Sequence, residues 1–229
     1  MSQPFYVAPE QVMKDRADYA RKGIARGRSL CAISYADGVM VCAENSSSTL
    51  RKVSEIYDRI AFAGVGKYNE FDQLRVAGVR HADMKGYQYS REDVDARSLA
   101  NAYAQMLGQI FTHEMKPMEV EILVAEIGHE PGQDELFHIL YDGSVVDEAR
   151  FSVLGGEAEA ITARLEETFA PEMTLESAVR AAVDALTGPE RTLGSGDLEV
   201  AVLARGNGRR KFDRIEGSDL DALLGAATS

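Results

Sequence analysis

The chain has 229 residues, of which 45% are hydrophobic and 27% are charged, and its formal net charge is −12. This length suits one large domain or two small ones, and the acidic balance argues against a nucleic-acid footprint, which needs a basic stripe. No apolar run approaches the ~20 residues of a membrane span, and the first residues lack the basic and apolar regions of a signal peptide. We therefore expect a cytoplasmic protein that binds neither nucleic acid nor a membrane.

A helix is predicted first, over residues 9–26, with proline in its first turn and Gly27 after its end. Its apolar residues recur near helical spacing, at Val12, Met13, Ala17, Ala20 and Ile24. The apolar face is narrow, so the pattern predicts a helix that packs along one stripe and is otherwise solvated.

A β-hairpin is predicted next. Asp37-Gly38 separates the apolar runs Leu30–Tyr35 and Val39–Glu44. An Asp-Gly pair between two such runs is the strongest short-range signal of a two-residue type I′ turn.

Both cysteines of the chain, Cys31 and Cys42, lie in this hairpin. With the Asp-Gly pair at the centre of the turn, Ile33 pairs with Cys42 and Cys31 pairs with Glu44. The two thiols are then diagonal neighbours ~7 Å apart. Because a disulfide needs Cβ atoms ~4 Å apart, we expect reduced, buried thiols, which fits a reducing compartment.

The remaining elements come in groups. Strands are predicted over Val53–Tyr57, Ile60–Val65, Val120–Ile127, Leu136–Tyr141, Val145–Phe151, Leu198–Ala204 and Phe212–Ile215. Helices are predicted over Tyr68–Lys85, Asp95–His113, Glu157–Phe169, Thr174–Leu186 and Ser218–Leu224, followed by a frayed tail over 225–229.

Strands that are grouped in runs, rather than alternating singly with helices, favour antiparallel sheets with helices on their faces. The predicted fold class is therefore α+β. We expect a four-layer αββα sandwich of two antiparallel sheets between helical layers, with an extra N-terminal helix, in a single domain over 1–229.

The histidines do not suggest a metal site. His81, His113, His129 and His138 have no ligand spacing to one another or to the cysteines, and EF-hand patterns are missing. The sequence thus predicts no bound metal and no cofactor.

Five segments carry a family resemblance, together with the hairpin and the Gly-Val-Gly-Lys turn at 64–67. They are YARKGIARG (Tyr19–Gly27), AEN (Ala43–Asn45), SEIYDR (Ser54–Arg59), NEFD (Asn69–Asp72) and VEILVAE (Val120–Glu126). In this order, and over almost the whole chain, they resemble the α-type subunits of the 20S proteasome, specifically the actinobacterial kind. Those subunits are non-catalytic members of the N-terminal-nucleophile hydrolase superfamily.

The resemblance implies a set of partners. Seven copies would form a homo-ring, and two such rings would flank two rings of proteolytic β subunits, which carry the catalytic threonine of this threonine-type endopeptidase complex. The α ring would gate substrate entry. It would also bind the C-terminal tail of a ring-shaped ATPase or of another activator. The pathway implied is degradation of proteins tagged with a small ubiquitin-like modifier.

Catalysis by this chain alone is not expected. An N-terminal nucleophile uses its own α-amine as base, so it must be the first residue of the mature chain. Proteolytic relatives have a Gly-Thr junction where this chain has Gly27 followed by Arg28, and their acidic helper falls near Glu44 without the familiar Asp. One alternative is a self-processed hydrolase that uses Ser29 or Cys31, and another is a stand-alone binding protein on this fold.

Lys52 aligns with the catalytic lysine of β subunits. In α-type subunits the matching lysine pairs with the C-terminal carboxylate of an activator, a task that suits a compact point charge. The resemblance therefore implies that Lys52 docks an activator. A surface lysine at a strand edge is the plainer alternative.

Two further segments have counterparts in the family. The residues that resemble the gate segment, which plugs the ring opening, are Ser2, Gln3, Pro4, Phe5, Tyr6, Val7, Ala8 and Pro9. The residues that match the loop lining the inner opening of the ring are His113, Glu114, Met115 and Lys116. An ordinary helix-to-strand loop is the alternative for the second segment.

Overall fold

The computed structural model describes residues 8–225 of the chain. Within this range the strands form two five-stranded antiparallel sheets. In spatial order the first sheet contains β10 (Phe212–Ile215), β9 (Leu198–Ala204), β2 (Gly38–Glu44), β1 (Leu30–Tyr35) and β8 (Phe151–Leu154). The second contains β3 (Val53–Tyr57), β4 (Ile60–Gly66), β5 (Val120–Glu126), β6 (Glu135–Ile139) and β7 (Val145–Glu148).

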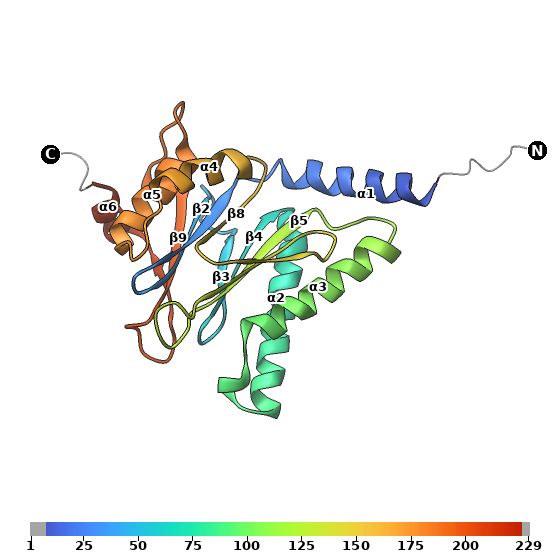
Figure 1. Ribbon diagram of the computed structural model, residues 1–229, viewed down its shortest axis with the longest axis horizontal. Coiled ribbons are helices and arrows are strands. Elements are labelled where there is room, and N and C mark those ends of the chain that lie inside the picture. The colour runs from blue at the N-terminus through green and yellow to red at the C-terminus, as the bar shows by residue number, and fades with distance from the viewer. Residues whose placement is uncertain (1–7, 226–229) are drawn as a thin grey trace, which may run out of the picture.

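The helices of residues 8–225 are α1 (Pro9–Ile24), α2 (Tyr68–Gln88), α3 (Ala96–His113), α4 (Ala158–Thr168), α5 (Leu175–Thr187) and α6 (Gly217–Gly225). Two short 3-10 helices, η1 (Arg91–Asp93) and η2 (Ser195–Asp197), lie between them. α2 and α3 cover the second sheet, whereas α4, α5 and α6 cover the first (Figure 1). The structure confirms the predicted α+β sandwich with an N-terminal helix.

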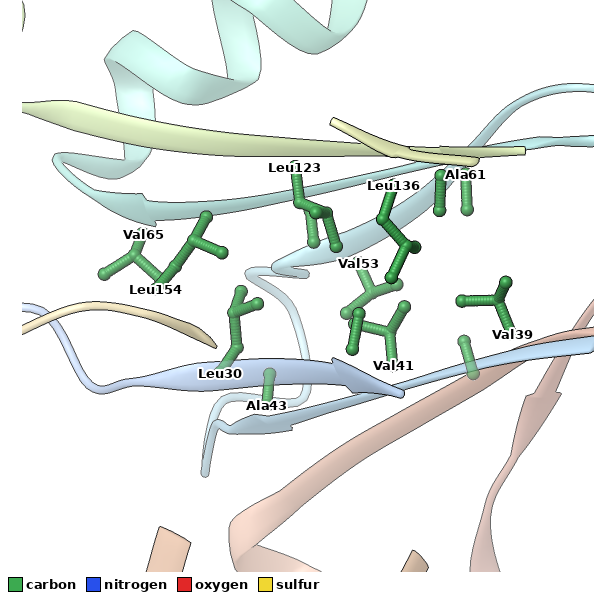
Figure 2. Packing of buried hydrophobic residues seen from close by; sticks show 14 of the residues in the cluster. Leu30, Val39, Val41, Ala43, Val53, Ala61, Val65, Leu123, Leu136 and Leu154 are labelled. Atoms are coloured by element: carbon green, nitrogen blue, oxygen red, sulfur yellow. The ribbon is translucent and has the colours of Figure 1, made fainter. Parts of the chain in front are cut away.

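A hydrophobic core fills the space between the two sheets (Figure 2). Alternate residues of the central strands, such as β1, β2, β4 and β5, point into it, because side chains along a strand alternate between the two faces. Each fully buried Val or Leu side chain stabilises the fold by about 1.5–3 kcal/mol relative to exposure. The labelled members of this cluster are Leu30, Val39, Val41, Ala43, Val53, Ala61, Val65, Leu123, Leu136 and Leu154.

The hairpin prediction had the wrong register. Tyr35 pairs with Gly38, so Ala36 and Asp37 form the turn and Cys31 lies directly opposite Cys42 rather than diagonal to it. Gly38 belongs to β2, and its φ of +150° and the backbone of β9 both require glycine, since a Cβ there would lie 1.9 Å from the carbonyl oxygen of Leu203. Glycine is thus required at position 38 by the close approach of β9 and not by a place at the centre of the turn. Both cysteines are free and buried.

The single strand predicted over Val145–Phe151 was also wrong. β7 ends at Glu148, and the chain then crosses to the other sheet, where β8 pairs with β1. β7 is a partly exposed edge strand, whereas all four residues of β8 are buried. The polar residues Asp147, Glu148 and Arg150 mark this crossing in the sequence.

The first helix is shorter than predicted, because α1 ends at Ile24 rather than at residue 26. Ala20 and Ile24 are buried against the inter-sheet core, but residues 8–15 are all exposed. The first turns of α1 therefore extend away from the sandwich (Figure 1). Of the predicted tail, Gly225 belongs to α6, and 226–229 lie outside the described residues.

Candidate functional site

Lys52 lies directly before β3, where the first sheet and the second approach each other, and its side chain is half-buried. Its Nζ atom donates a hydrogen bond to the carbonyl oxygen of Arg28 at 2.5 Å. This carbonyl stands just before β1, at the position where proteolytic relatives were expected to carry their nucleophile. Lys52 is thus directed toward the start of β1.

Burial lowers the pKa of Lys52 to about 8, even though the carboxylates of Glu44 and Glu199 pull it upward. The charge on Arg28 adds to the lowering. Lys52 is therefore mostly protonated at neutral pH, but its positive charge is incompletely compensated by its surroundings. Such a group gains stabilisation when a further carboxylate arrives.

Glu44, at the end of β2, holds two arginines, and one of them, Arg28, also acts on the charge of Lys52. Its side chain is only 4% exposed, and it accepts hydrogen bonds from the guanidinium of Arg28 and from Nη1 of Arg191 at 3.1 and 3.2 Å. The side chains of Arg28 and Arg191 are 58% and 43% exposed. Positive charge therefore faces solvent above a buried carboxylate.

A cavity opens beside these arginines. It lies between the segment that joins α1 to β1 and the start of α4, and its lining carries more basic than acidic side chains. The lining residues are Ala25, Arg26, Gly27, Arg28, Ser29, Glu44, Gly156, Glu157 and Arg191. The chemistry of this lining suits an anionic group.

Glu199 on β9 fixes the other side of the lysine. Its carboxylate accepts hydrogen bonds from the backbone amides of Lys52 at 2.8 Å and Val53 at 3.2 Å. It also accepts one from Asn45 Nδ2 at 2.8 Å and one from Arg214 Nη1 at 2.7 Å. These contacts set the backbone of Lys52 in place.

Sequence reasoning missed Glu199 and Arg191. They lie 147 positions from their partners Lys52 and Glu44, so no local pattern connects them. One signal was present, because Glu199 is the single charged residue in the otherwise apolar strand LEVAVLA. A buried charge in such a strand needs partners.

The two alternative nucleophiles are both buried. Cys31 is fully buried beneath the α4–α5 layer, and burial together with the neighbouring Cys42 raises the pKa of its thiol well above the usual value. Burial also raises the pKa of Cys42 to about 12. The thiolate is the nucleophilic form of cysteine, so neither thiol is activated. Ser29 is also buried, and Arg28 precedes it in the chain.

The loop over 113–116 follows α3 and lies apart from the Lys52 hydrogen bonds. His113 ends the helix, Glu114 caps it, and the side chain of Met115 is fully exposed. Lys116 forms ion pairs with Glu70 at 2.7 Å and Glu119 at 2.8 Å. Burial opposes its charge, but these two carboxylates outweigh burial and raise the pKa of Lys116.

Of the predicted gate segment, residues 1–7 lie outside the described residues. Ala8 is the N-cap of α1, and Pro9 is the first residue of that helix. The segment is therefore carried directly on α1.

In residues 8–225, no group of three or more His, Cys, Asp and Glu side chains is arranged to hold a metal ion. Across the same stretch, no helix combines the length and the apolar character needed to cross a membrane.

Comparison with known proteins gives a consistent result. A sequence model of the family described as "Proteasome subunit" matches residues 24–203. The chain is 61% identical over 225 residues to a protein of Acidimicrobium ferrooxidans named "Proteasome subunit alpha", covering 98% of this chain and 97% of that protein. Proteins with the same name from Kineococcus radiotolerans and Thermobifida fusca are each 56% identical, covering 98% of this chain and 98% and 91% of their own lengths.

Proposed function

This chain belongs to the proteasome subunit family, and on that premise we propose that it gates substrate entry into a proteolytic particle and docks an activator through Lys52. In general terms, it is a non-catalytic core subunit that assembles into rings with β subunits. The proposed outer ring contains seven copies. The proposed pathway degrades proteins that carry a small ubiquitin-like tag, and the proposed setting is the cytoplasm.

The docking proposal rests on the environment of Lys52. A half-buried ammonium with a lowered pKa lies beside the partly exposed Arg28, which shares the buried Glu44 with Arg191, so that basic groups gather here in a chain whose net charge is −12. A C-terminal carboxylate is a compact anion that such a site stabilises, and capture of chain termini is a known mode of peptide recognition. The proposed ligand is therefore the C-terminal tail of a ring-shaped ATPase or of another activator.

The gating proposal rests on the position of α1. This helix extends beyond the sandwich (Figure 1), and the segment over residues 1–8 directly precedes it in the sequence. The loop over 113–116, with its exposed Met115, is proposed to line the opening that this segment closes. Both assignments follow the family resemblance.

Two experiments test the proposal as a whole. The purified chain should show no peptidase activity, and co-expression with its β partner should produce it; activity from the chain alone would contradict the non-catalytic role. Native mass spectrometry of the co-expressed particle should give seven copies of this chain in each outer ring.

Gating is tested by deleting residues 1–8 from the assembled particle. Hydrolysis of a short fluorogenic peptide should rise, because entry is no longer obstructed. Unchanged hydrolysis would mean that the segment closes nothing.

A further inference from the structure

A cavity of about 640 Å³ opens where β1 ends, and it shares no lining residue with the cavity beside Arg28 and Arg191. The turn between β1 and β2 lies on the far side of the sandwich from α1 (Figure 1). The cavity is bounded by the connections from β5 to β6, from β7 to β8 and from α4 to α5. Its volume falls in the range of small-molecule sites, about 300–1,000 Å³. The lining residues that decide its chemistry are Tyr35, Asp134, Arg150, Phe169, Glu172 and Arg205.

Backbone hydrogen bonds fix the walls of this cavity. The amide of Ser34 donates to the carbonyl oxygen of Arg150 at 2.9 Å, and the amide of Ala36 donates to that of Met173 at 2.9 Å. The end of β1 is thereby joined both to the crossing from β7 to β8 and to the connection from α4 to α5. The cavity is therefore formed before a ligand arrives, as is usual for small-molecule sites.

Two of the four charged side chains in the lining neutralise each other. Arg205 and Asp134 are only 12% and 7% exposed, and Nη1 and Nη2 of the arginine donate to the two carboxylate oxygens at 2.6 and 3.1 Å. Asp134 also accepts a hydrogen bond from the amide of Gly128 at 2.9 Å. This pair therefore adds no net charge to the cavity.

The other two charged side chains, Arg150 and Glu172, are exposed and opposite in sign. In the part of the chain that the structure describes, neither side chain forms an ion pair or a hydrogen bond. Glu172 also has a φ of +60°, and no other non-glycine residue of 8–225 has a positive φ. Backbone held in such a sparsely populated conformation is concentrated at functional sites. One unpaired cation and one unpaired anion are thus available to a ligand.

The apolar part of the wall is aromatic. The Phe169 ring is half-buried and packs on Phe151 with a centroid distance of 5.7 Å, and the Arg150 guanidinium lies 5.7 Å from the Phe169 centroid. Tyr35 is only 7% exposed, yet its hydroxyl makes no hydrogen bond to any residue between 8 and 225. Burial and the nearby Asp37 raise the pKa of Tyr35 to about 12, so the hydroxyl remains a donor at neutral pH. A buried phenol normally has a partner, which a ligand in this cavity can supply.

We propose that this cavity binds a zwitterion that carries an aromatic side chain. The carboxylate pairs with Arg150, whose guanidinium can donate two parallel hydrogen bonds, and the ammonium pairs with Glu172. The aromatic ring packs against Phe169, and the Tyr35 hydroxyl donates to a remaining carboxylate oxygen. An aromatic amino acid has this chemistry, and so has a short peptide with an aromatic residue. The inference depends neither on the Lys52 site nor on gating.

Binding is measured by fluorine NMR with L-4-fluorophenylalanine and the particle assembled with the β subunit. We expect saturable binding with a dissociation constant of about 1 mM or below, which suits a probe of this size. Two probes that each lack one charge are compared with it: 3-(4-fluorophenyl)propanoate has no ammonium, and 2-(4-fluorophenyl)ethylamine has no carboxylate. Each should bind about tenfold more weakly than the amino acid, because one charge-assisted hydrogen bond is lost.

Substitutions assign each charge of the ligand to its partner. Arg150→Gln should weaken binding of the amino acid about tenfold, and Glu172→Gln should do the same. In Glu172→Gln the amino acid and the propanoate should then bind equally, because the partner of the ammonium is gone. Arg209→Gln is the control, since it removes a charge that is 78% exposed and lies outside the cavity, and it should leave binding unchanged. The three probes test the inference on the unmodified chain even if a variant does not assemble.

The dipeptide L-alanyl-L-4-fluorophenylalanine distinguishes the two sources of the ligand. Tighter binding of the dipeptide would assign the site to short peptides, and equal or weaker binding would assign it to free amino acids; both results support a zwitterion site. The inference is overturned if neither probe binds up to about 10 mM, or if the probes that lack one charge bind as tightly as the amino acid. Unchanged affinity in both Arg150→Gln and Glu172→Gln would overturn it as well.

Discussion

Glu44 and Glu199 lie on neighbouring strands of the same sheet, and their side chains are almost equally buried. Their partners differ. Glu199 is held by two backbone amides, by Asn45 and by Arg214, all of them in the folded framework. Glu44 is held by Arg28 and Arg191, whose side chains are about half exposed.

Burial alone therefore does not separate a structural carboxylate from a functional one. A backbone amide cannot leave Glu199 without local unfolding, whereas an arginine at the surface can turn from Glu44 to another anion. We interpret Glu199 as the residue that sets the position of Lys52, and Glu44 as the residue that keeps the arginines in place until a ligand arrives.

The largest effect is expected for Glu199→Ala. This change removes the acceptor of the Lys52 and Val53 amides and leaves the mostly buried Arg214 guanidinium without its carboxylate, and it should lower the free energy of unfolding by about 3–5 kcal/mol. Urea unfolding of the purified chain measures the loss. Glu216→Ala, which removes a largely exposed carboxylate paired with Arg51, is the control and should change stability by about 0.5 kcal/mol or less. A loss at Glu199 no larger than the control would remove the distinction between the two buried glutamates.

Lys52→Ala should weaken binding of the activator and leave the fold and ring assembly intact. Losing a charge-assisted hydrogen bond to a carboxylate costs about 1.5–3 kcal/mol, which corresponds to about a tenfold to hundredfold weaker affinity. Fluorescence anisotropy of a labelled activator C-terminal peptide on the assembled particle measures this. Ring assembly should remain intact in native mass spectrometry. Unchanged affinity would remove Lys52 from the site.

The sequence predicted the layers of this fold well, because they depend on periodic apolar patterns within single elements. Apart from the single strand predicted over Val145–Phe151, which is two strands, the predicted elements end within three residues of their observed limits. The errors arose where the register or the end of a strand depends on pairing with a strand that is distant in the sequence. The close approach of β9 requires glycine at position 38, and the strand breaks after Glu148 because β8 pairs with β1 in the other sheet.

In the candidate site, too, the residues that depend on tertiary contacts were not predicted from the sequence. Lys52 was named as a candidate because a family resemblance points to it. Arg191 and Glu199 were not named, since their partners come from elements that only the tertiary fold brings together. Charged residues inside otherwise apolar strands, such as Glu199, are the one sequence signal that could have indicated the site.

The pH dependence of docking should follow Lys52. Burial lowers its pKa to about 8, so the protonated form that attracts a carboxylate is present below about pH 8 and is lost above it. The dissociation constant of the activator peptide should be flat from pH 6.5 to 7.5 and should rise toward about tenfold per unit above pH 8. Lys52→Arg, whose guanidinium stays protonated, should remove the rise. A rise that persists in this variant would assign the titration to another group.

Glu44→Gln should have the smallest and most specific effect. The amide has nearly the same shape and can still accept a hydrogen bond from Arg28, so the loss of stability should be smaller than for Glu199→Ala. The charge that competes for Arg28 and Arg191 is gone. At pH 6.5, where Lys52 is protonated in either case, the peptide should therefore bind a few-fold more tightly.

The same variant, although it binds the peptide more tightly at pH 6.5, should lose affinity at a lower pH than the unmodified chain. Glu44 raises the pKa of Lys52, so its neutralisation lowers that pKa further, and the loss of affinity should begin below pH 8. Tighter binding at pH 6.5 combined with an earlier loss at higher pH is a pattern that a merely structural glutamate does not produce. Weaker binding at pH 6.5 would instead mean that Glu44 orients the arginines for the ligand, and that it belongs with Glu199 in the framework.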